Sequence, residues 1–294
     1  MSGTATPHSA DALSLCMMVK NEERNLPACL DSVRGLAGEL IVVDTGSTDR
    51  TPSIAAAYGA EVIPLDFSIA DFAAARNCAI ARASGPWILA LDADETLDRT
   101  SAPEIARLIA LGENAGYFLE RHNRSPDSTT ATDYVVRLFP NRPQYRYRGR
   151  VHETVDASIL AGGGRLRQAA IRIDHNFATD PEARRRKNRW YIEILQEEIA
   201  ADPSCDSRLD FLAAEYHQLG MYDEAAEIAE RIVAMRPLDA RAHLFAGAYH
   251  LLYKPDPARA RADFSQALKL RPGYEEAESF LQLMDRQEGP HMPP

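Results

Sequence analysis

The sequence predicts an α/β domain over residues 13–178 followed by an all-helical domain over residues 179–288. In the first part, short apolar segments alternate with helix-like segments, an order that implies a mostly parallel sheet with helices on both faces. In the second part the strand pattern disappears, and prolines recur at positions 203, 237 and 272. Residues 1–12 and 289–294 are expected to be a flexible lead-in and a tail.

The elements of the α/β part follow one another in a regular order. Strands are predicted at residues 13–19, 39–43, 61–65 and 87–91, with helices at residues 21–33, 51–58 and 72–82. Glu22 and Glu23 fall in the first turn of the first helix, where the helix dipole favours acids. After residue 100 the pattern changes to a helix at 101–111, strands at 117–121, 134–139 and 165–173, and an alternating segment at 145–151.

The helical part has an internal period. Its prolines are 34 and 35 residues apart, and small residues and aromatics recur between them, as in the segments 212–225 and 246–267. This pattern resembles tetratricopeptide repeats, with two clear repeats between flanking helices. A plain helical bundle is the alternative interpretation.

Composition excludes several classes of protein. The net charge of −10 argues against nonspecific nucleic-acid binding. The four cysteines show no metal-ligand spacing, which favours reduced thiols in a cytoplasmic protein. We expect no transmembrane segment, because no apolar run approaches the length that spans a bilayer. We also expect no signal peptide, because the first residues lack a basic and an apolar region.

A pair of carboxylates marks the end of the fourth predicted strand. The apolar run 88–91 leads directly into Asp92-Ala93-Asp94-Glu95. On a strand, positions i and i+2 point the same way, so Asp92 and Asp94 would converge on one ligand. Oxygen ligands suit a hard cation such as Mg²⁺ or Mn²⁺. The alternative is an acidic turn that caps the next helix.

Four ordered motifs carry a resemblance to a known family: residues 17–23, 42–51, 71–77 and 91–95. With these motifs the N-terminal half resembles the family 2 glycosyltransferases, inverting enzymes of the Rossmann-like GT-A fold. Residues 137–141 and 149–153 resemble a bacterial branch of the family whose members often carry C-terminal tetratricopeptide repeats.

The resemblance implies a nucleotide-sugar donor, with a UDP-hexose as the expected one, and a bound Mn²⁺ or Mg²⁺. Asp94 would bind the metal, and Asp92 would contact the ribose side of the nucleotide, or the metal through water. Asp44 would contact the nucleotide base. The family usually has two acids at this point, whereas this chain has Asp44 followed by Thr45. Arg76 would contact the base or the diphosphate. The remaining nucleotide contacts are expected from Val19, Lys20, Glu22 and Ala93.

The catalytic base implied by the resemblance is Glu153, which would take the proton of the acceptor as it attacks the sugar. Asp133 and Asp156 are rivals for this role. Two histidines compete for a further metal ligand: His175, late in the domain, and His152, which adjoins the proposed base and would otherwise contact the diphosphate.

The sequence therefore predicts a metal-dependent inverting glycosyltransferase that acts on a protein, peptide or glycan acceptor. The helical repeats would position the acceptor or form a homodimer. A repeat-based adaptor with a vestigial transferase domain is the alternative. A nucleotidyltransferase is disfavoured, because residues 19–22 offer no glycine-rich phosphate loop.

Overall fold

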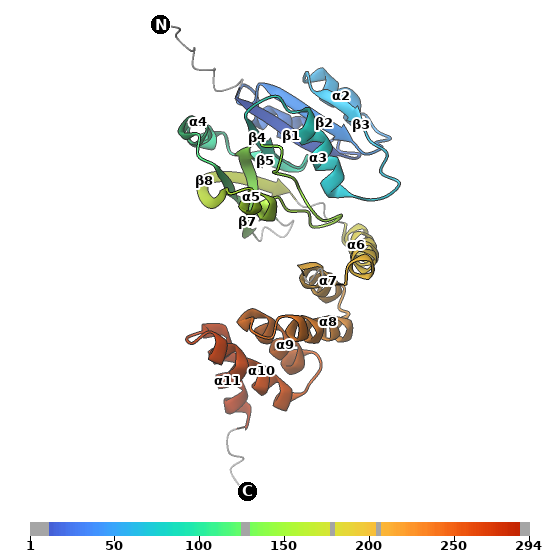
Figure 1. Ribbon diagram of the computed structural model, residues 1–294. Coiled ribbons are helices and arrows are strands. Elements are labelled where there is room, and N and C mark those ends of the chain that lie inside the picture. Colours follow the sequence, from blue (N-terminus) through green and yellow to red (C-terminus); the bar gives the residue numbers. More distant parts are fainter. Residues whose placement is uncertain (1–11, 125–129, 177–179, 204–206, 289–294) are drawn as a thin grey trace. The chain divides into compact units, whose positions relative to one another are not determined.

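The computed structural model describes residues 12–124, 130–176, 180–203 and 207–288. The chain divides into two compact units, Met1–Thr179 and Asp180–Pro294 (Figure 1). Residues 1–11 of the lead-in expected at 1–12, and the tail at 289–294, lie outside the described residues, as does Cys205. Ala12, the last residue of the expected lead-in, is buried.

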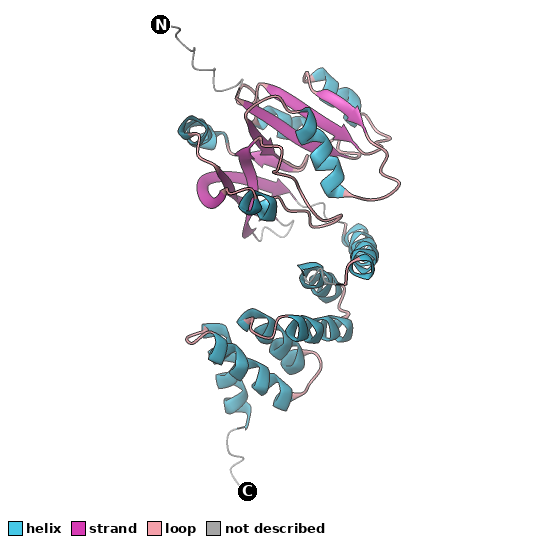
Figure 2. Cartoon of the chain, viewed as in Figure 1, coloured by secondary structure: helices cyan, strands magenta, loops and turns pink. Residues whose placement is uncertain are grey.

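Within the described residues, the first unit is built on one sheet of eight strands in the order β3-β2-β1-β4-β7-β6-β8-β5. Figure 2 shows strands in this unit and only helices in the second. The strands are β1 (Leu13–Val19), β2 (Glu39–Asp44), β3 (Glu61–Pro64), β4 (Trp87–Ala90), β5 (Glu95–Leu97), β6 (Ala115–Arg124), β7 (Thr130–Pro140) and β8 (Arg165–Asn176). The first four pair in parallel, as predicted from the strand–helix alternation. Strand β7 joins β4 antiparallel, so the second half of the sheet is mixed.

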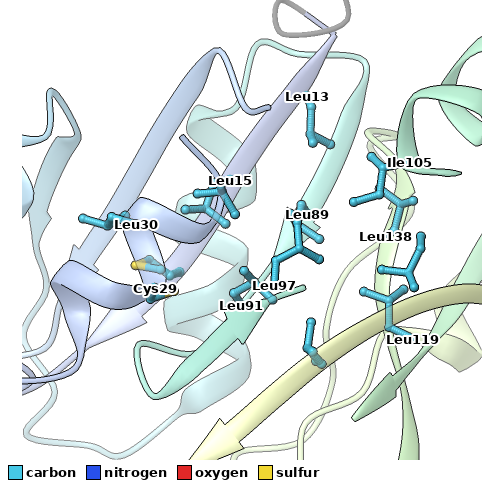
Figure 3. Packing of buried hydrophobic residues seen from close by; sticks show 14 of the residues in the cluster. Leu13, Leu15, Cys29, Leu30, Leu89, Leu91, Leu97, Ile105, Leu119 and Leu138 are labelled. Carbon is cyan, nitrogen blue, oxygen red and sulfur yellow. The ribbon is translucent and has the colours of Figure 1, made fainter. Parts of the chain in front are cut away.

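Helices cover both faces of this sheet because the side chains of its strands alternate. In β1, Leu13, Leu15 and Met17 enter one apolar cluster and Cys16 enters the other. The first cluster, partly drawn in Figure 3, receives α1 (Leu26–Ser32), α2 (Thr51–Ala57) and α4 (Ala102–Leu111). The second receives α3 (Phe72–Arg82) and α5 (Asp156–Ala161). Two buried layers therefore fix the strand ends where polar residues gather.

The first helix begins later than predicted. It starts at Leu26 rather than at residue 21, because the preceding residues bond to another loop. Asn21 adopts a left-handed φ of 58°, its N–H donates to Ser47 Oγ, and its Oδ1 accepts from the N–H of Thr48. Glu22 and Glu23 therefore precede the helix, and the prediction that they occupy its first turn was wrong.

Three further elements differ from the sequence prediction. Strand β5 and helix α5 were not predicted, because each is short and lacks a long periodic pattern. The alternating segment 145–151 forms no strand within the described residues and makes only an isolated bridge between Arg148 and Thr154. Its alternation still decides burial, since Tyr145 and Tyr147 enter the core while Arg148 is exposed.

The second unit consists of helices, each packed against the next along the chain. They are α6 (Pro181–Ala201), α7 (Ser207–Gln218), α8 (Tyr222–Met235), α9 (Ala240–Leu252), α10 (Pro257–Leu270) and α11 (Glu275–Glu288). Helices α9 and α10 approach closely at Gly247, where an added Cβ would lie 2.7 Å from the Phe264 ring. The predicted period therefore corresponds to successive helix pairs. None of the helices in the described ranges is long and apolar enough to span a membrane.

Candidate functional site

Asp92 and Asp94 lie in a turn rather than on a strand. Strand β4 ends at Ala90, and the turn is closed by a hydrogen bond from the Glu95 N–H to the Asp92 carbonyl oxygen. The alternation rule that would aim both carboxylates at one ligand therefore does not apply. The two side chains take different partners.

Asp92 is the centre of a buried network of alternating charges. Its Oδ1 accepts from Arg76 Nη2, and its Oδ2 accepts from Arg137 Nη2, each at 2.6 Å. Arg76 Nε donates to Glu153 Oε1, also at 2.6 Å. Arg137 Nη2 also reaches Glu95 Oε1 at 3.0 Å, and Glu95 is fully buried. Helix α3 and the loop that carries Glu153, far apart in sequence, are thus joined through Arg76.

The charges of this network depend on one another. Burial alone would raise the pKa of Asp92, but the guanidinium groups of Arg137 and Arg76 outweigh it and hold that pKa well below its usual range. Burial would likewise lower the pKa of Arg76, and the carboxylates of Asp92 and Glu153 raise it instead. The ionised forms of Asp92 and Arg76 therefore stabilise each other.

Asp94 and His175 come together on the other side of the turn. His175 lies within β8, opposite Glu95 of β5, and its Nε2 is 3.3 Å from Asp94 Oδ2. Its Nδ1 is 2.8 Å from Asn123 Oδ1. An amide oxygen only accepts, so this contact places a proton on Nδ1, and in the neutral imidazole the Nε2 lone pair then lies on the side of Asp94.

The Asp94–His175 pair fits a divalent cation whose other coordination positions are filled by a bound diphosphate and water. Two ligand atoms at right angles around a cation, each with a bond of about 2.1 Å, lie about 3 Å apart. The separation of 3.3 Å between Asp94 Oδ2 and His175 Nε2 is close to this value. The Asn123 contact is the outer hydrogen bond that metal-binding histidines usually make. No group of three or more metal-binding side chains occurs in the described part of the chain. A bound diphosphate and water would have to complete the coordination.

The loops after β1 and β2 are fastened to each other. The N–H groups of Glu22 and Glu23 donate to Thr51 Oγ1 and Asp49 Oδ2. Burial raises the pKa of Glu22, and Asp94, Asp92 and Asp49 add to that shift, so the Glu22 carboxyl faces the same acidic region. Asp49 serves both this connection and the start of α2, because its Oδ1 accepts from the Thr51 N–H.

The other expected nucleotide contacts are spread over the same sheet edge. Asp44 ends β2, is largely buried, and accepts from the Ser47 N–H at 3.2 Å. Val19 pairs with Asp44 in register, and its carbonyl oxygen already accepts from Thr45. Lys20 is exposed beside them, and Ala93 is buried in the turn.

The candidate bases differ in their surroundings. Glu153 is 12% exposed and has one oxygen on Arg76. Asp133 on β7 is held by both Arg121 Nε and Nη2, at 2.9 and 2.7 Å. Asp156 begins α5, and burial raises its pKa. His152 has a left-handed φ of 50°, a conformation rare for a residue other than glycine, directly before Glu153.

Sequence reasoning assigned no role to Arg137 or Glu95, which complete the network. Both residues lie in the motifs that resemble the family. The sequence signal that could have identified them is a charged residue within a run of otherwise apolar strand residues. Arg137 occupies such a position in β7 between Val136 and Leu138. A charge in a buried strand requires a partner.

Comparison with known proteins places this geometry in a family. Residues 14–173 match the sequence profile described as Glycosyl transferase family 2. The chain belongs to glycosyl transferase family 2. The family and the fold class predicted from the motifs are thereby confirmed.

Three relatives show how far the similarity extends. A TPR repeat-containing protein of Synechococcus elongatus is 44% identical over 51% of this chain and 36% of its own length. The glycosyltransferase SunS of Bacillus subtilis is 25% identical over 74% of this chain and 52% of its own. The lipopolysaccharide core biosynthesis glycosyltransferase LpsC of Rhizobium meliloti is 32% identical over 52% and 60%. The chain thus spans between about a third and three fifths of these relatives.

A solved structure with a similar fold is that of S. aureus TarS 1-349 in complex with UDP-GlcNAc. It aligns with a TM-score of 0.53 over 92% of this chain and 91% of that one. The sequence identity is 14%, so the similarity concerns the fold alone.

Proposed function

We propose that this family 2 member is a metal-dependent inverting glycosyltransferase that transfers a hexose from a nucleotide sugar, with UDP as the nucleotide. Support comes from the family membership and from the site at the carboxyl ends of the strands, where such sheets bind ligands. The observation that carries the metal dependence is the charge of that site.

Carboxylates outnumber guanidinium groups around the turn. The described site holds six acids, Glu22, Asp92, Asp94, Glu95, Asp133 and Glu153, and three arginines, Arg76, Arg121 and Arg137. The arginines are already paired with these acids. A nucleoside diphosphate is itself strongly anionic, so the protein alone would repel it. A cation held by Asp94 would remove this repulsion.

The proposed metal ligands are Asp94 Oδ2 and His175 Nε2, with Mn²⁺ or Mg²⁺ as the ion. Bound there, the ion supplies charge neutralisation for the departing nucleoside diphosphate. The role of the protein is to present these two atoms, and Asn123 fixes the orientation of the imidazole. His152 is not needed for this arrangement, and its proposed role is a contact with the diphosphate.

The proposed base is Glu153. Oε1 is held by Arg76, so the carboxylate has a fixed orientation while Oε2 remains available to take a proton from the acceptor. The acceptor oxygen or nitrogen attacks the anomeric carbon as its proton passes to Oε2, and the nucleoside diphosphate leaves from the opposite side. Arg76 positions this base directly, and Arg137 acts on Arg76 through Asp92.

The proposed acceptor is a protein, peptide or glycan. The helical repeats support a macromolecular acceptor, because stacked helix pairs present an extended surface rather than a small pocket.

The decisive experiment mixes the whole chain with UDP-, GDP- and dTDP-hexoses in the presence of Mn²⁺. Binding of the nucleotide sugar is measured by calorimetry, and slow hydrolysis of the donor is measured as the nucleoside diphosphate released. We expect UDP-sugar binding that requires Mn²⁺. Glu153→Gln should retain this binding and lose turnover, whereas Glu61→Gln, at an exposed pair with Arg82, should keep both. A folded protein that binds none of these donors would contradict the proposal and favour the adaptor alternative.

A further inference from the structure

Helix α6 begins with a dense cluster of positive charge. Within the run Arg184–Arg189, five of six residues are cations, and all five are exposed. The whole chain has a net charge of −10, so these cations oppose the balance of the molecule. The name basic run denotes Arg184, Arg185, Arg186, Lys187 and Arg189.

The basic run is unfavourable for the helix that contains it. Residues three and four apart lie side by side on a helix, so Arg185 and Arg186 both face Arg189, and Arg184 faces Lys187. Like charges at these spacings destabilise a helix. Arg186 lies 3.7 Å from Asp180 and 3.8 Å from Glu182, but both acids are exposed and such pairs stabilise little. The repulsion within the basic run therefore costs the helix stability that these two pairs restore only in small part.

An exposed aromatic residue accompanies the charges. Trp190 directly follows the basic run and is 38% exposed, and Lys187 Nζ lies 5.4 Å from the Tyr191 ring centre. Tryptophan beside lysine and arginine is a composition typical of the interface between lipid headgroups and acyl chains. The two features together indicate a binding partner whose surface is both anionic and partly apolar.

We propose that the N-terminal end of α6 binds the surface of a membrane containing anionic phospholipids. The basic run would contact phosphate headgroups, and Trp190 would enter the interfacial layer. The chain has no membrane-spanning helix in its described ranges, so this attachment would be peripheral. This interaction does not depend on the proposed transferase activity.

The acidic second half of α6 does not cancel the attraction. Glu193, four positions beyond Arg189 and about 6 Å along the helix axis, offsets one of the five cations. Glu197 lies eleven positions beyond Arg186, about 16 Å along the axis, which is about twice the distance over which charges are screened at physiological salt. A membrane touching the end of α6 would therefore experience the basic run more strongly than the acids. A nucleic acid extends past the cluster and would meet the negative charge of the rest of the chain.

The test is sedimentation of the whole protein with phosphatidylcholine vesicles, with and without phosphatidylglycerol. We expect binding only with phosphatidylglycerol, weakened by salt. The triple variant Arg185→Gln/Arg186→Gln/Lys187→Gln should bind on the order of 100-fold more weakly. The control Arg241→Gln/Lys254→Gln/Lys269→Gln loses the same charge from separate exposed positions on other parts of the helical unit and should bind as the unmodified protein does.

Fluorescence gives a second readout. The chain has two tryptophans, and Trp87 is buried in the sheet, so a blue shift on adding phosphatidylglycerol vesicles reports Trp190. Trp190→Phe should abolish the shift while leaving sedimentation measurable. Equal weakening in both triple variants, absence of vesicle binding, or binding to single-stranded DNA but not to vesicles would each overturn the proposal.

Discussion

Replacing Arg137 with methionine tests whether the charge network around Asp92 holds the first unit together. Arg137 is 7% exposed, and its single atom Nη2 contacts both Asp92 and Glu95. Methionine keeps most of the apolar stem but removes both ion pairs. Glu95, which is fully buried, is then left with Arg121 Nη1 at 3.4 Å, and Asp92 is left with Arg76.

Removing one partner of a buried ion pair costs about 3–5 kcal/mol, because the remaining charge stays buried without compensation. Each acid here keeps one other arginine, so we expect the lower end, about 3 kcal/mol. The assay is urea unfolding followed by fluorescence in a Trp190→Phe background. Trp87, stacked on Tyr117 at 6.1 Å, then reports the first unit alone.

Arg107→Met is the matched control. Arg107 makes an ion pair of similar length with Glu104, but its side chain is 56% exposed, so its loss should leave the midpoint nearly unchanged. Equal effects of the two substitutions would refute a stabilising role for the buried network. So would a loss below about 1 kcal/mol for Arg137→Met, because a buried carboxylate that loses its shorter ion pair should cost more than that.

Three other predictions concern the proposed metal site, the stability of the protein at low pH and the packing of the helical repeats. Asn123→Ala should weaken Mn²⁺-dependent UDP binding about 10–100-fold in calorimetry, because the His175 ring loses its orientation; unchanged affinity would argue against His175 as a ligand. The pKa of Asp92 is lowered on folding, so its stabilisation is complete above its unfolded pKa of about 3.9 and is lost as pH falls towards the folded value. The difference in unfolding free energy between the parent and Asp92→Asn should therefore shrink below about pH 4. Gly247→Ala should destabilise the helical unit by about 1–3 kcal/mol in urea unfolding monitored by circular dichroism, because its Cβ would strike the Phe264 ring.

The sequence predicted the fold best where the pattern was long and periodic. The strand at residues 13–19 and the helix at 72–82 were placed at their observed bounds, since a continuous apolar run and the cap that Asp71 provides for the Ala74 N–H both act locally. The start of α1 was misplaced, because the bonds from Asn21 to Ser47 and Thr48 connect loops 26 and 27 residues apart. Such long-range contacts leave no local periodic signal.

The site shows the same division. The motifs selected Arg76, Asp92 and Glu153, and the structure joins these three through ion pairs. Their assigned roles in catalysis and nucleotide binding stay predictions. Arg137 received no role, because the need for a cation in the middle of β7 becomes visible only when β4 pairs beside it and brings Asp92 near.

The turn between β4 and β5 gives the two acids Asp92 and Asp94 different surroundings. Had β4 continued, both would share one face and compete for one cation. Because the chain turns, Asp92 is occupied on both oxygens by arginines, whereas Asp94 faces His175. An acid held by two guanidinium groups is a poor metal ligand, since the ion would have to displace two charge-assisted hydrogen bonds. Asp92 is thus better suited to position Arg76 and the proposed base, and the proposed metal-binding role falls to Asp94.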